Sequence, residues 1–295
     1  MKPSETPQAK VRFAAGWLAR VARFARAESA ARRTPREDLA NDHSRAAGGG
    51  GEFAGRRRYR PGDDLRHFDW EALARGAGPL VRMRQRDSGE RWCVLLDSSA
   101  SMAVGDPPKL QLAAELALAI LAVGLEHGFE VSLATRKSVA VFRATSELAR
   151  ASAELEELSS AGANGFEACF AHPSVGRASR WILIGDFLDM EPASLDAIAV
   201  RTRRLVGAAV LAPIELSPLA LARPGSAIEW RDPERGERLP TLIGTVEVAS
   251  YAALLSEHLG RWHAALARTR GGLVVAQAGQ AFEAPARRIL SNLVS

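Results

Sequence analysis

The sequence predicts an α/β protein whose doubly wound, mostly parallel sheet is flanked by helices. Two observations predict this fold. From residue 92 onward, short apolar segments alternate with longer segments of helical periodicity, and the apolar segments at 92–96, 181–185 and 205–211 are not interrupted by charged residues. Strands that are apolar on both faces are typical of parallel sheets covered by helices on both sides. At 295 residues, the chain is long enough to bury a full core.

The expected elements follow in a regular order. Strands are expected at 92–97, 129–135, 138–143, 181–185, 205–211, 228–231, 239–243 and 272–276, and helices at 109–127, 146–159, 165–172, 193–204, 248–269 and 281–294. Pro107-Pro108 and Gly128 flank the long helix at 109–127, as is typical of a helix start and end. Because only Arg136 and Lys137 separate two of the strands, these two strands are expected to form a hairpin.

The chain is expected to divide into three segments: residues 1–50, residues 51–91 and residues 92–295, the last being the α/β domain with a C-terminal extension. The first segment is a helical arm followed by a linker that leads into the run Gly48-Gly49-Gly50-Gly51. Within the arm, residues 11–27 have helical amphipathic spacing. Two interpretations remain open for its apolar face, packing on the protein's own core or contact with a membrane surface or partner. The apolar residues of this face are Phe13, Trp17, Leu18, Val21 and Phe24.

Composition and charge narrow the class of protein. Hydrophobic residues make up 47% and charged residues 25%, values of an ordinary globular protein and not of a disordered one. Residues 1–60 contain 14 Lys/Arg and 6 Asp/Glu, so their charge is +8 and the rest of the chain carries −3 of the total +5. The two cysteines, Cys93 and Cys169, have no metal or redox spacing. With no apolar run long enough to span a bilayer and no secretory signal, a cytoplasmic location is expected.

Arginines and aromatic residues are concentrated in residues 51–91, and carboxylates are interspersed among them. Basic residues next to aromatic ones are typical of single-stranded nucleic-acid binding. Arginine–carboxylate pairs within the segment are the other interpretation. In that case the residues form either a charged network that holds the segment onto the α/β domain or a surface that a partner recognises. The residues in question are Arg58, Tyr59, Asp63, Arg66, Asp69, Trp70 and Arg75.

Two aspartates follow apolar strands and mark the candidate functional site. Asp97 ends the first strand and is followed by Ser99 and Ser101, and Asp186 follows the strand at 181–185. Ligand sites in open α/β sheets lie at the carboxyl ends of the strands, so both aspartates are expected at one edge. Carboxylate and hydroxyl oxygens are ligands that Mg²⁺ or another divalent cation prefers. The simpler alternative is an Asp/Ser helix cap without a metal.

Both regions resemble known families. The Asp97-Ser98-Ser99-Ala100-Ser101 run, with Ile184-Gly185-Asp186, resembles the metal-ion-dependent adhesion site of von Willebrand factor A domains. A second run resembles the signature of the bacterial domain of unknown function 58 family, whose members join it to a von Willebrand A-like domain. It reads Arg58-Tyr59-Arg60-Pro61-Gly62-Asp63-Asp64-Leu65-Arg66-His67-Phe68-Asp69-Trp70, followed by Ala74-Arg75. Together these resemblances cover roughly residues 50–215.

The resemblance implies a ligand set for a divalent cation. Asp97, Ser99, Ser101 and Asp186 match family ligands, and one coordination position is left for a carboxylate of the partner. The family also uses a threonine on a second loop. In this chain that neighbourhood is Ala161-Gly162-Ala163-Asn164-Gly165, where Ala163 has no ligand atom and Asn164 is the possible substitute. The sequence therefore predicts a degenerate form of the site.

Three functions are consistent with the sequence. The leading hypothesis is a non-enzymatic protein-interaction module, which the family resemblance implies to be an adaptor or assembly factor for a MoxR-type AAA+ ATPase. The second is a metal-dependent hydrolase or phosphoesterase, although no GxSxG, HExxH or HxE pattern is present. The third is a nucleic-acid binder that uses the basic N-terminal region, although the chain contains no recognised nucleic-acid motif.

Overall fold

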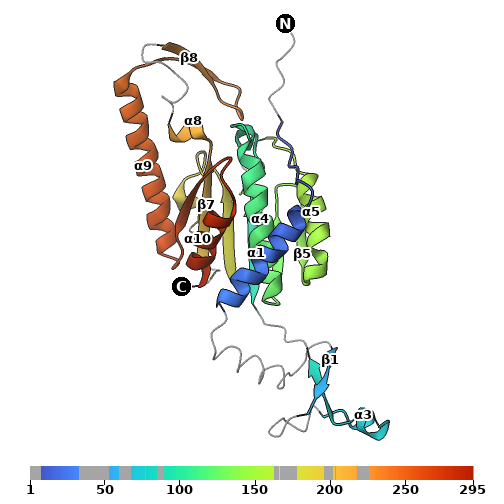
Figure 1. Cartoon of the computed structure of the whole chain (residues 1–295). Coiled ribbons are helices and arrows are strands. Elements are labelled where there is room, and N and C mark those ends of the chain that lie inside the picture. The colour runs from blue at the N-terminus through green and yellow to red at the C-terminus, as the bar shows by residue number, and fades with distance from the viewer. Residues whose placement is uncertain are drawn as a thin grey trace.

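The computed structural model (Figure 1) describes residues 8–32, 53–59, 68–76, 78–84, 90–162, 166, 178–195, 202, 204–217 and 226–294. The elements of these residues, in chain order, are α1 (Trp17–Arg32), β1 (Phe53–Arg58), α3 (Trp70–Ala74), β2 (Leu80–Arg84), β3 (Arg91–Leu96), η2 (Ala100–Ala103), α4 (Lys109–Glu126), β4 (Glu130–Ala134), β5 (Val139–Phe142), η3 (Thr145–Glu147), α5 (Leu148–Glu156), β6 (Arg180–Gly185), η5 (Pro192–Leu195), β7 (Arg204–Leu211), α8 (Pro213–Leu216), β8 (Ser226–Arg231), β9 (Arg238–Ile243), α9 (Thr245–Ala267), β10 (Leu273–Gln277) and α10 (Glu283–Val294).

The central sheet has six described strands in the order β10-β7-β6-β3-β4-β5. All neighbouring pairs are parallel except β4 and β5, which form the predicted antiparallel hairpin. The chain runs from β3 to β4 on one side and later returns to β6 on the other side of β3. Ligand sites of open α/β sheets lie at such a reversal of strand order. The predicted mixed α/β fold with a mostly parallel sheet is therefore confirmed.

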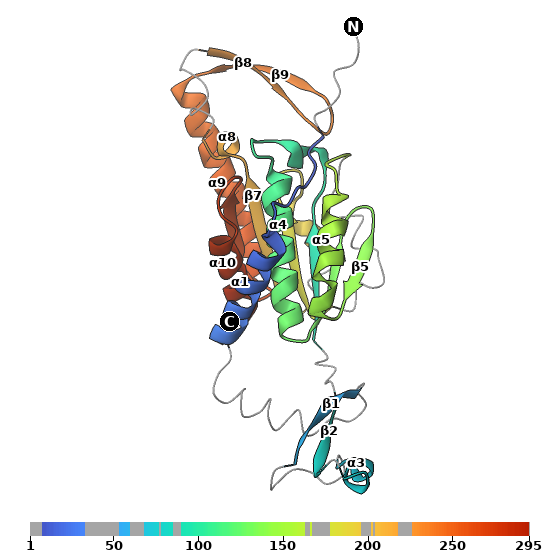
Figure 2. The same cartoon turned by 45° about the vertical axis from the view of Figure 1, so that its right-hand side comes forward.

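Helices cover both faces of the sheet, as the uniformly apolar strands predict (Figures 1 and 2). In β3, Trp92, Val94 and Leu96 belong to the core shared with α1, α4, α5 and α10. The alternate residues Cys93 and Leu95 belong to a second core, which includes α9. Because successive strand residues point to opposite faces, a strand buried on both sides must be apolar at every position.

The N-terminal helix packs on the core, which was one of its two predicted interpretations. Trp17, Val21 and Phe24 are buried, and the Trp17 ring lies edge-on to Phe282 with centroids 4.9 Å apart. The helix begins later than predicted and extends to Arg32, into the expected linker. Among the described residues, no helix is both long and apolar enough to cross a membrane.

The described residues between 53 and 84 form an arrangement that the sequence did not predict. β1 and β2 pair as an antiparallel hairpin, and α3 lies beside β2. This small unit lies apart from the six-stranded sheet, at the end where the strands begin (Figures 1 and 2). Its separation means that its described residues contribute no side chain to the opposite, carboxyl edge of the sheet.

Two predicted helices are only partly covered by the described residues. Of the helix expected at 165–172, Phe166 alone is described. Of the helix expected at 193–204, residues 193–195 lie in the short 3₁₀ helix η5, and the expected end is wrong because Arg204 is the first residue of β7. The C-terminal extension agrees better with expectation, because β10 adds a parallel strand beside β7 and α10 packs over it. Earlier in the chain, between α8 and α9, β8 and β9 form a hairpin that reaches over the carboxyl edge of the sheet (Figure 2).

Candidate functional site

The structure places Asp97 and Asp186 side by side at the carboxyl edge. β3 and β6 are hydrogen-bonded neighbours in parallel register, and the Asp97 amide donates to the Ile184 carbonyl over 2.9 Å. Gly185 makes this approach possible, because a Cβ added there would lie 2.7 Å from the Asp97 Cβ. Both aspartates are nearly buried, with 5% exposure for Asp97 and 4% for Asp186.

The loop after Asp97 gathers two hydroxyls beside the carboxylate. Asp97 Oδ1 accepts a hydrogen bond from the Ser99 amide at 2.8 Å, and the hydroxyls of Ser99 and Ser101 lie 2.9 Å apart. Ser99 is the residue before η2, but its side chain forms no capping bond to that helix. The Ser99 and Ser101 hydroxyls contact each other. The alternative of a helix cap does not account for the placement of Ser99, because its hydroxyl does not bond to a backbone amide of η2.

The second loop of the predicted site lies against the first. The Ala161 amide donates to the Ser98 carbonyl at 2.9 Å, and the Ala100 amide donates to the Gly162 carbonyl at 2.8 Å. The two residues that the sequence analysis compared with the family threonine, Ala163 and Asn164, lie outside the described residues.

A buried lysine, which the sequence analysis did not single out, binds Asp186. Lys109 is the first residue of α4 and is fully buried, and its Nζ donates to Asp186 Oδ2 at 2.8 Å and to Glu215 Oε1 at 2.6 Å. The other Asp186 oxygen accepts from the Leu188 amide at 3.2 Å. Phe187, between these residues, has a φ of 63°, a left-handed conformation uncommon for a bulky residue.

The two aspartates therefore have different electrostatic surroundings. Burial, and next the negative charge of Asp186, raise the pKa of Asp97 to about 6, although hydrogen bonds from Ser99 and the charge of Lys109 oppose the rise. Burial alone would lower the pKa of Lys109. The carboxylates of Asp186 and Glu215 overcome that effect and raise the Lys109 pKa above its ordinary value. Lys109 is therefore a fixed ammonium cation.

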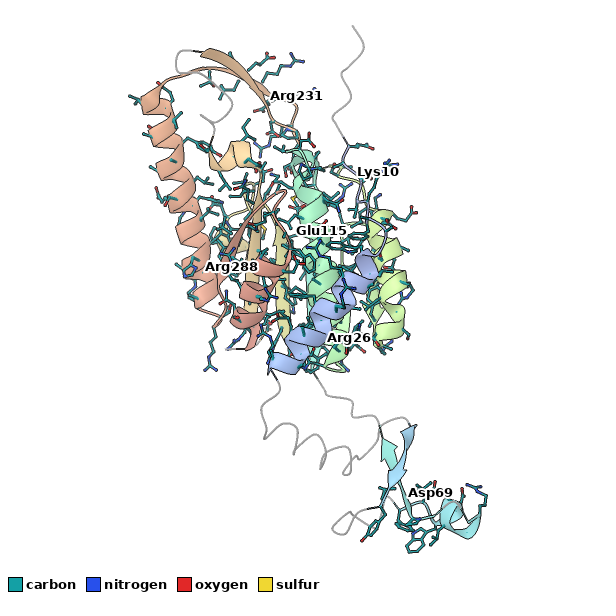
Figure 3. The ribbon with its side chains drawn as sticks, in the orientation of Figure 1. Lys10, Arg26, Asp69, Glu115, Arg231 and Arg288 are labelled. Atoms are coloured by element: carbon teal, nitrogen blue, oxygen red, sulfur yellow. The ribbon has the colours of Figure 1, made fainter. Side chains whose placement is uncertain are left out.

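The β8–β9 hairpin brings a further carboxyl to the site. Glu234 lies in the turn between the two strands. Burial, and then the neighbouring carboxyl of Asp189, raise the pKa of Glu234 to about 7, although the hydroxyls of Ser99 and Ser101 oppose the rise. Figure 3 labels Arg231 next to this turn, above the loops at the carboxyl edge.

The signature residues lie elsewhere, in the β1–β2–α3 unit. Asp69 is buried and its Oδ1 accepts from the Ala72 amide at 3.0 Å, which caps α3. The Tyr59 and Phe68 rings meet edge to face, whereas Trp70 is 62% exposed and Arg75 makes a long, exposed ion pair with Glu71 at 3.9 Å. Figure 3 shows Asp69 at a distance from the sheet. Asp63, Arg66 and the side chain of Arg58 lie outside the description.

The donor atoms suit a divalent cation only in part. Asp97, Ser99 and Ser101 present hard oxygen ligands within one loop. Asp186 has both carboxylate oxygens engaged, one of them by an ammonium. Among the described residues, no three His, Cys, Asp or Glu side chains come together as a metal-binding group. A metal would therefore depend on the Asp97 loop and would need further ligands.

One of the missed residues had a signal in the sequence. Glu215 follows β7 by four residues, so the same strand-end rule that identified Asp186 would have identified it. Lys109 stands at the start of a largely apolar helix, but its partners are separated from it by 77 and 106 positions. Glu234 has no such signal, because the fold of the β8–β9 hairpin over the sheet edge places it there.

Comparisons with known proteins give one positive result. No curated protein and no solved structure matches the chain at a significant level. A family model, described as Protein of unknown function DUF58, matches residues 55–250, which includes the signature segment, both aspartates and the β8–β9 hairpin. Because the match covers more than half of the chain, this protein belongs to the DUF58 family.

Proposed function

We propose that this protein is a non-enzymatic interaction module that binds an acidic side chain of a partner protein at the carboxyl edge of its sheet. The observation that carries the proposal is the convergence of Asp97, Ser99 and Ser101 beside Asp186 at the reversal of strand order. Hydroxyl groups can donate hydrogen bonds to a carboxylate.

We further propose that the α/β domain is von Willebrand A-like. The mostly parallel sheet, the Asp-x-Ser-x-Ser loop after β3 and the aspartate after β6 support this proposal. A divalent cation such as Mg²⁺ would be held by Asp97, Ser99 and Ser101, with Asp186 beside them, and would supply positive charge for the partner's carboxylate. Without a cation, the serine hydroxyls are the donors that the chain itself offers, because the Lys109 ammonium is buried and bound to Asp186 and Glu215.

The proposed partner is a MoxR-type AAA+ ATPase, for which this protein would act as an adaptor or assembly factor. This choice rests on the resemblance of residues 58–75 and of the Asp97 loop to the family, whose members are expected to work with such ATPases. The exposed Trp70 and Arg75 of the β1–β2–α3 unit offer a second surface for the same partner.

Capture of a MoxR-type ATPase by the full-length protein tests this function. The experiment compares the wild type, Asp97→Ala and the control Glu157→Ala, which removes an exposed carboxylate at the end of α5. Each protein is tested once with magnesium and once with EDTA. We expect Asp97→Ala to lose at least tenfold in affinity while Glu157→Ala keeps wild-type binding.

Several outcomes would contradict the proposal. Equal recovery of the ATPase by the wild type and by Asp97→Ala would remove this site from the interface. A phosphatase or nuclease activity that disappears in Asp97→Ala would support the hydrolase alternative instead. The EDTA arm decides separately whether a cation bridges the two proteins, because only a bridged complex loses affinity when the metal is removed.

A further inference from the structure

Lys109 places a positive charge at the edge of the sheet where the sequence predicted a divalent cation. It is the first residue of α4, its side chain is fully buried, and its ammonium contacts Asp186, after β6, and Glu215, in α8 after β7. Burial disfavours an ammonium, and so does the positive end of a helix dipole. The two carboxylates must therefore compensate for both unfavourable effects.

The two carboxylates are oriented in the way that metal-binding carboxylates are. Asp186 Oδ2 and Glu215 Oε1 lie 2.8 and 2.6 Å from Lys109 Nζ. The other oxygen of Asp186 accepts from the Leu188 amide at 3.2 Å, and the other oxygen of Glu215 accepts from the Ala212 amide at 2.7 Å. Carboxylates that bind metal ions are oriented by such hydrogen bonds. Each carboxylate thus directs one oxygen to a common point, and Nζ occupies that point.

Other contacts hold the two carboxylates in place independently of the lysine. Asp186 follows β6, which pairs in parallel with both β3 and β7. The Tyr251 hydroxyl of α9 donates to the Glu215 carbonyl at 2.8 Å and so fixes α8. We therefore expect both carboxylates to keep their positions when the Lys109 side chain is shortened.

We propose that the Lys109 ammonium takes the place of a divalent cation at this point, so that Asp186 and Glu215 bind a metal ion only when Lys109 is removed. A metal ion on the same two oxygens would lie close to the ammonium, and the two positive charges would repel each other. The inference departs from the ligand set that the family resemblance implies, in which Asp186 binds the metal. It does not depend on the proposed partner.

Binding of Mn²⁺ to the full-length protein tests the proposal, with electron paramagnetic resonance to measure the free ion. Mn²⁺ prefers carboxylate and water oxygens. The experiment compares the wild type, Lys109→Ala, which leaves room for an ion and its waters, and the control Lys137→Ala, which removes an exposed lysine. Because the repelling charge is gone, we expect Lys109→Ala to bind Mn²⁺ about tenfold more tightly than the other two proteins. Equal affinity in all three would overturn the proposal.

Glu215→Gln assigns the gain to the partners of the lysine. Added to Lys109→Ala, it should return the Mn²⁺ affinity to the wild-type value, because one of the two metal-binding carboxylates is lost. In the protein that retains Lys109, the same change should leave the Mn²⁺ affinity as it is. Loss of Mn²⁺ binding in Glu215→Gln alone would show that Glu215 binds metal beside Lys109 and would overturn the proposal.

Thermal unfolding gives a second readout, which also serves if Lys109→Ala folds poorly without metal. A ligand that binds only the folded state raises Tm, so Mn²⁺ at about a hundredfold its Kd should raise the Tm of Lys109→Ala by about 5 °C relative to EDTA. The wild type and Lys137→Ala should shift by less. Equal shifts in the three proteins, or a Lys109→Ala protein that Mn²⁺ does not stabilise, would contradict the inference. These outcomes involve no partner, so they are distinct from a failure of the proposed function.

Discussion

The two aspartates at the carboxyl edge are neighbours in space, but only one of them has a permanent cation. Asp186 receives the Lys109 ammonium at 2.8 Å and a backbone amide on its other oxygen. Asp97 accepts from the Ser99 amide and faces hydroxyls, and its pKa rises to about 6 because burial and Asp186 disfavour its charge. The difference shows that Asp186 is satisfied within the fold, whereas burial and the neighbouring Asp186 disfavour the charge of Asp97.

Asp69 in the β1–β2–α3 unit is a useful third case. It is also buried, and it caps α3 through the Ala72 amide. A helix N-terminus favours a carboxylate, so the fold gives this aspartate a structural role without any ligand. Asp97, by contrast, has its charge disfavoured by burial and by the neighbouring Asp186. The predictions below test this contrast.

Removal of Lys109 should have the largest effect. Lys109→Met leaves Asp186 and Glu215 in a largely buried pocket without their shared ammonium, and breaking a buried ion pair in this way costs about 3–5 kcal/mol. Chemical denaturation measures the loss, with Lys137→Met, a change at an exposed lysine, as the control. A loss below about 1 kcal/mol, the range of surface pairs, would show that Asp186 does not depend on Lys109.

Replacement of Asp97 should act in the opposite direction. Asp97→Asn keeps an oxygen that can accept from the Ser99 amide but removes the penalised charge, so in metal-free buffer at pH 7 we expect a gain of about 2–3 kcal/mol in the free energy of unfolding. If Asp97→Asn proves less stable than the wild type in that buffer, the proposed asymmetry between the two aspartates is contradicted.

The pH dependence gives the sign of the Asp97 effect. The folded pKa of about 6 lies above the ordinary value of 3.8, so the folded state binds the proton more tightly. Protonated Asp97 therefore contributes to the free energy of unfolding of the wild type, and this stabilisation should be lost as the pH rises from about 4 to about 6. Asp97→Asn should show no such loss. Denaturation of both proteins across this range shows whether their stability difference appears in that window.

Replacement of Asp69 should have the smallest effect and a local one. Asp69→Ala removes the cap of α3 at a cost of about 1 kcal/mol. Because the β1–β2–α3 unit lies apart from the sheet, hydrogen exchange should become faster in 68–76 but not in 91–96. Arg75→Ala, which removes only the exposed 3.9 Å pair, is the control and should leave exchange unchanged. Faster exchange in β3 would indicate that this unit supports the main core.

The fold and half of the candidate site could be predicted because they depend on local pattern. Apolar runs identify strands buried on both faces, and the strand-end rule placed Asp97 and Asp186 at one edge, as the β3–β6 register confirms. The β1–β2 hairpin was missed because arginines alternate with few apolar residues there, so the segment has no clear strand period. The boundary of α1 was misplaced because Glu28 and Ser29 are polar and yet buried.

The sequence by itself determined which residues can form strands, which carboxylates and hydroxyls follow them, and the family to which the chain is similar. Only the tertiary structure decided the charge balance of the site. Lys109 meets Asp186 and Glu215 across 77 and 106 positions. Periodicity reports which side of an element is buried, but it contains no information about which distant charges will share that buried space.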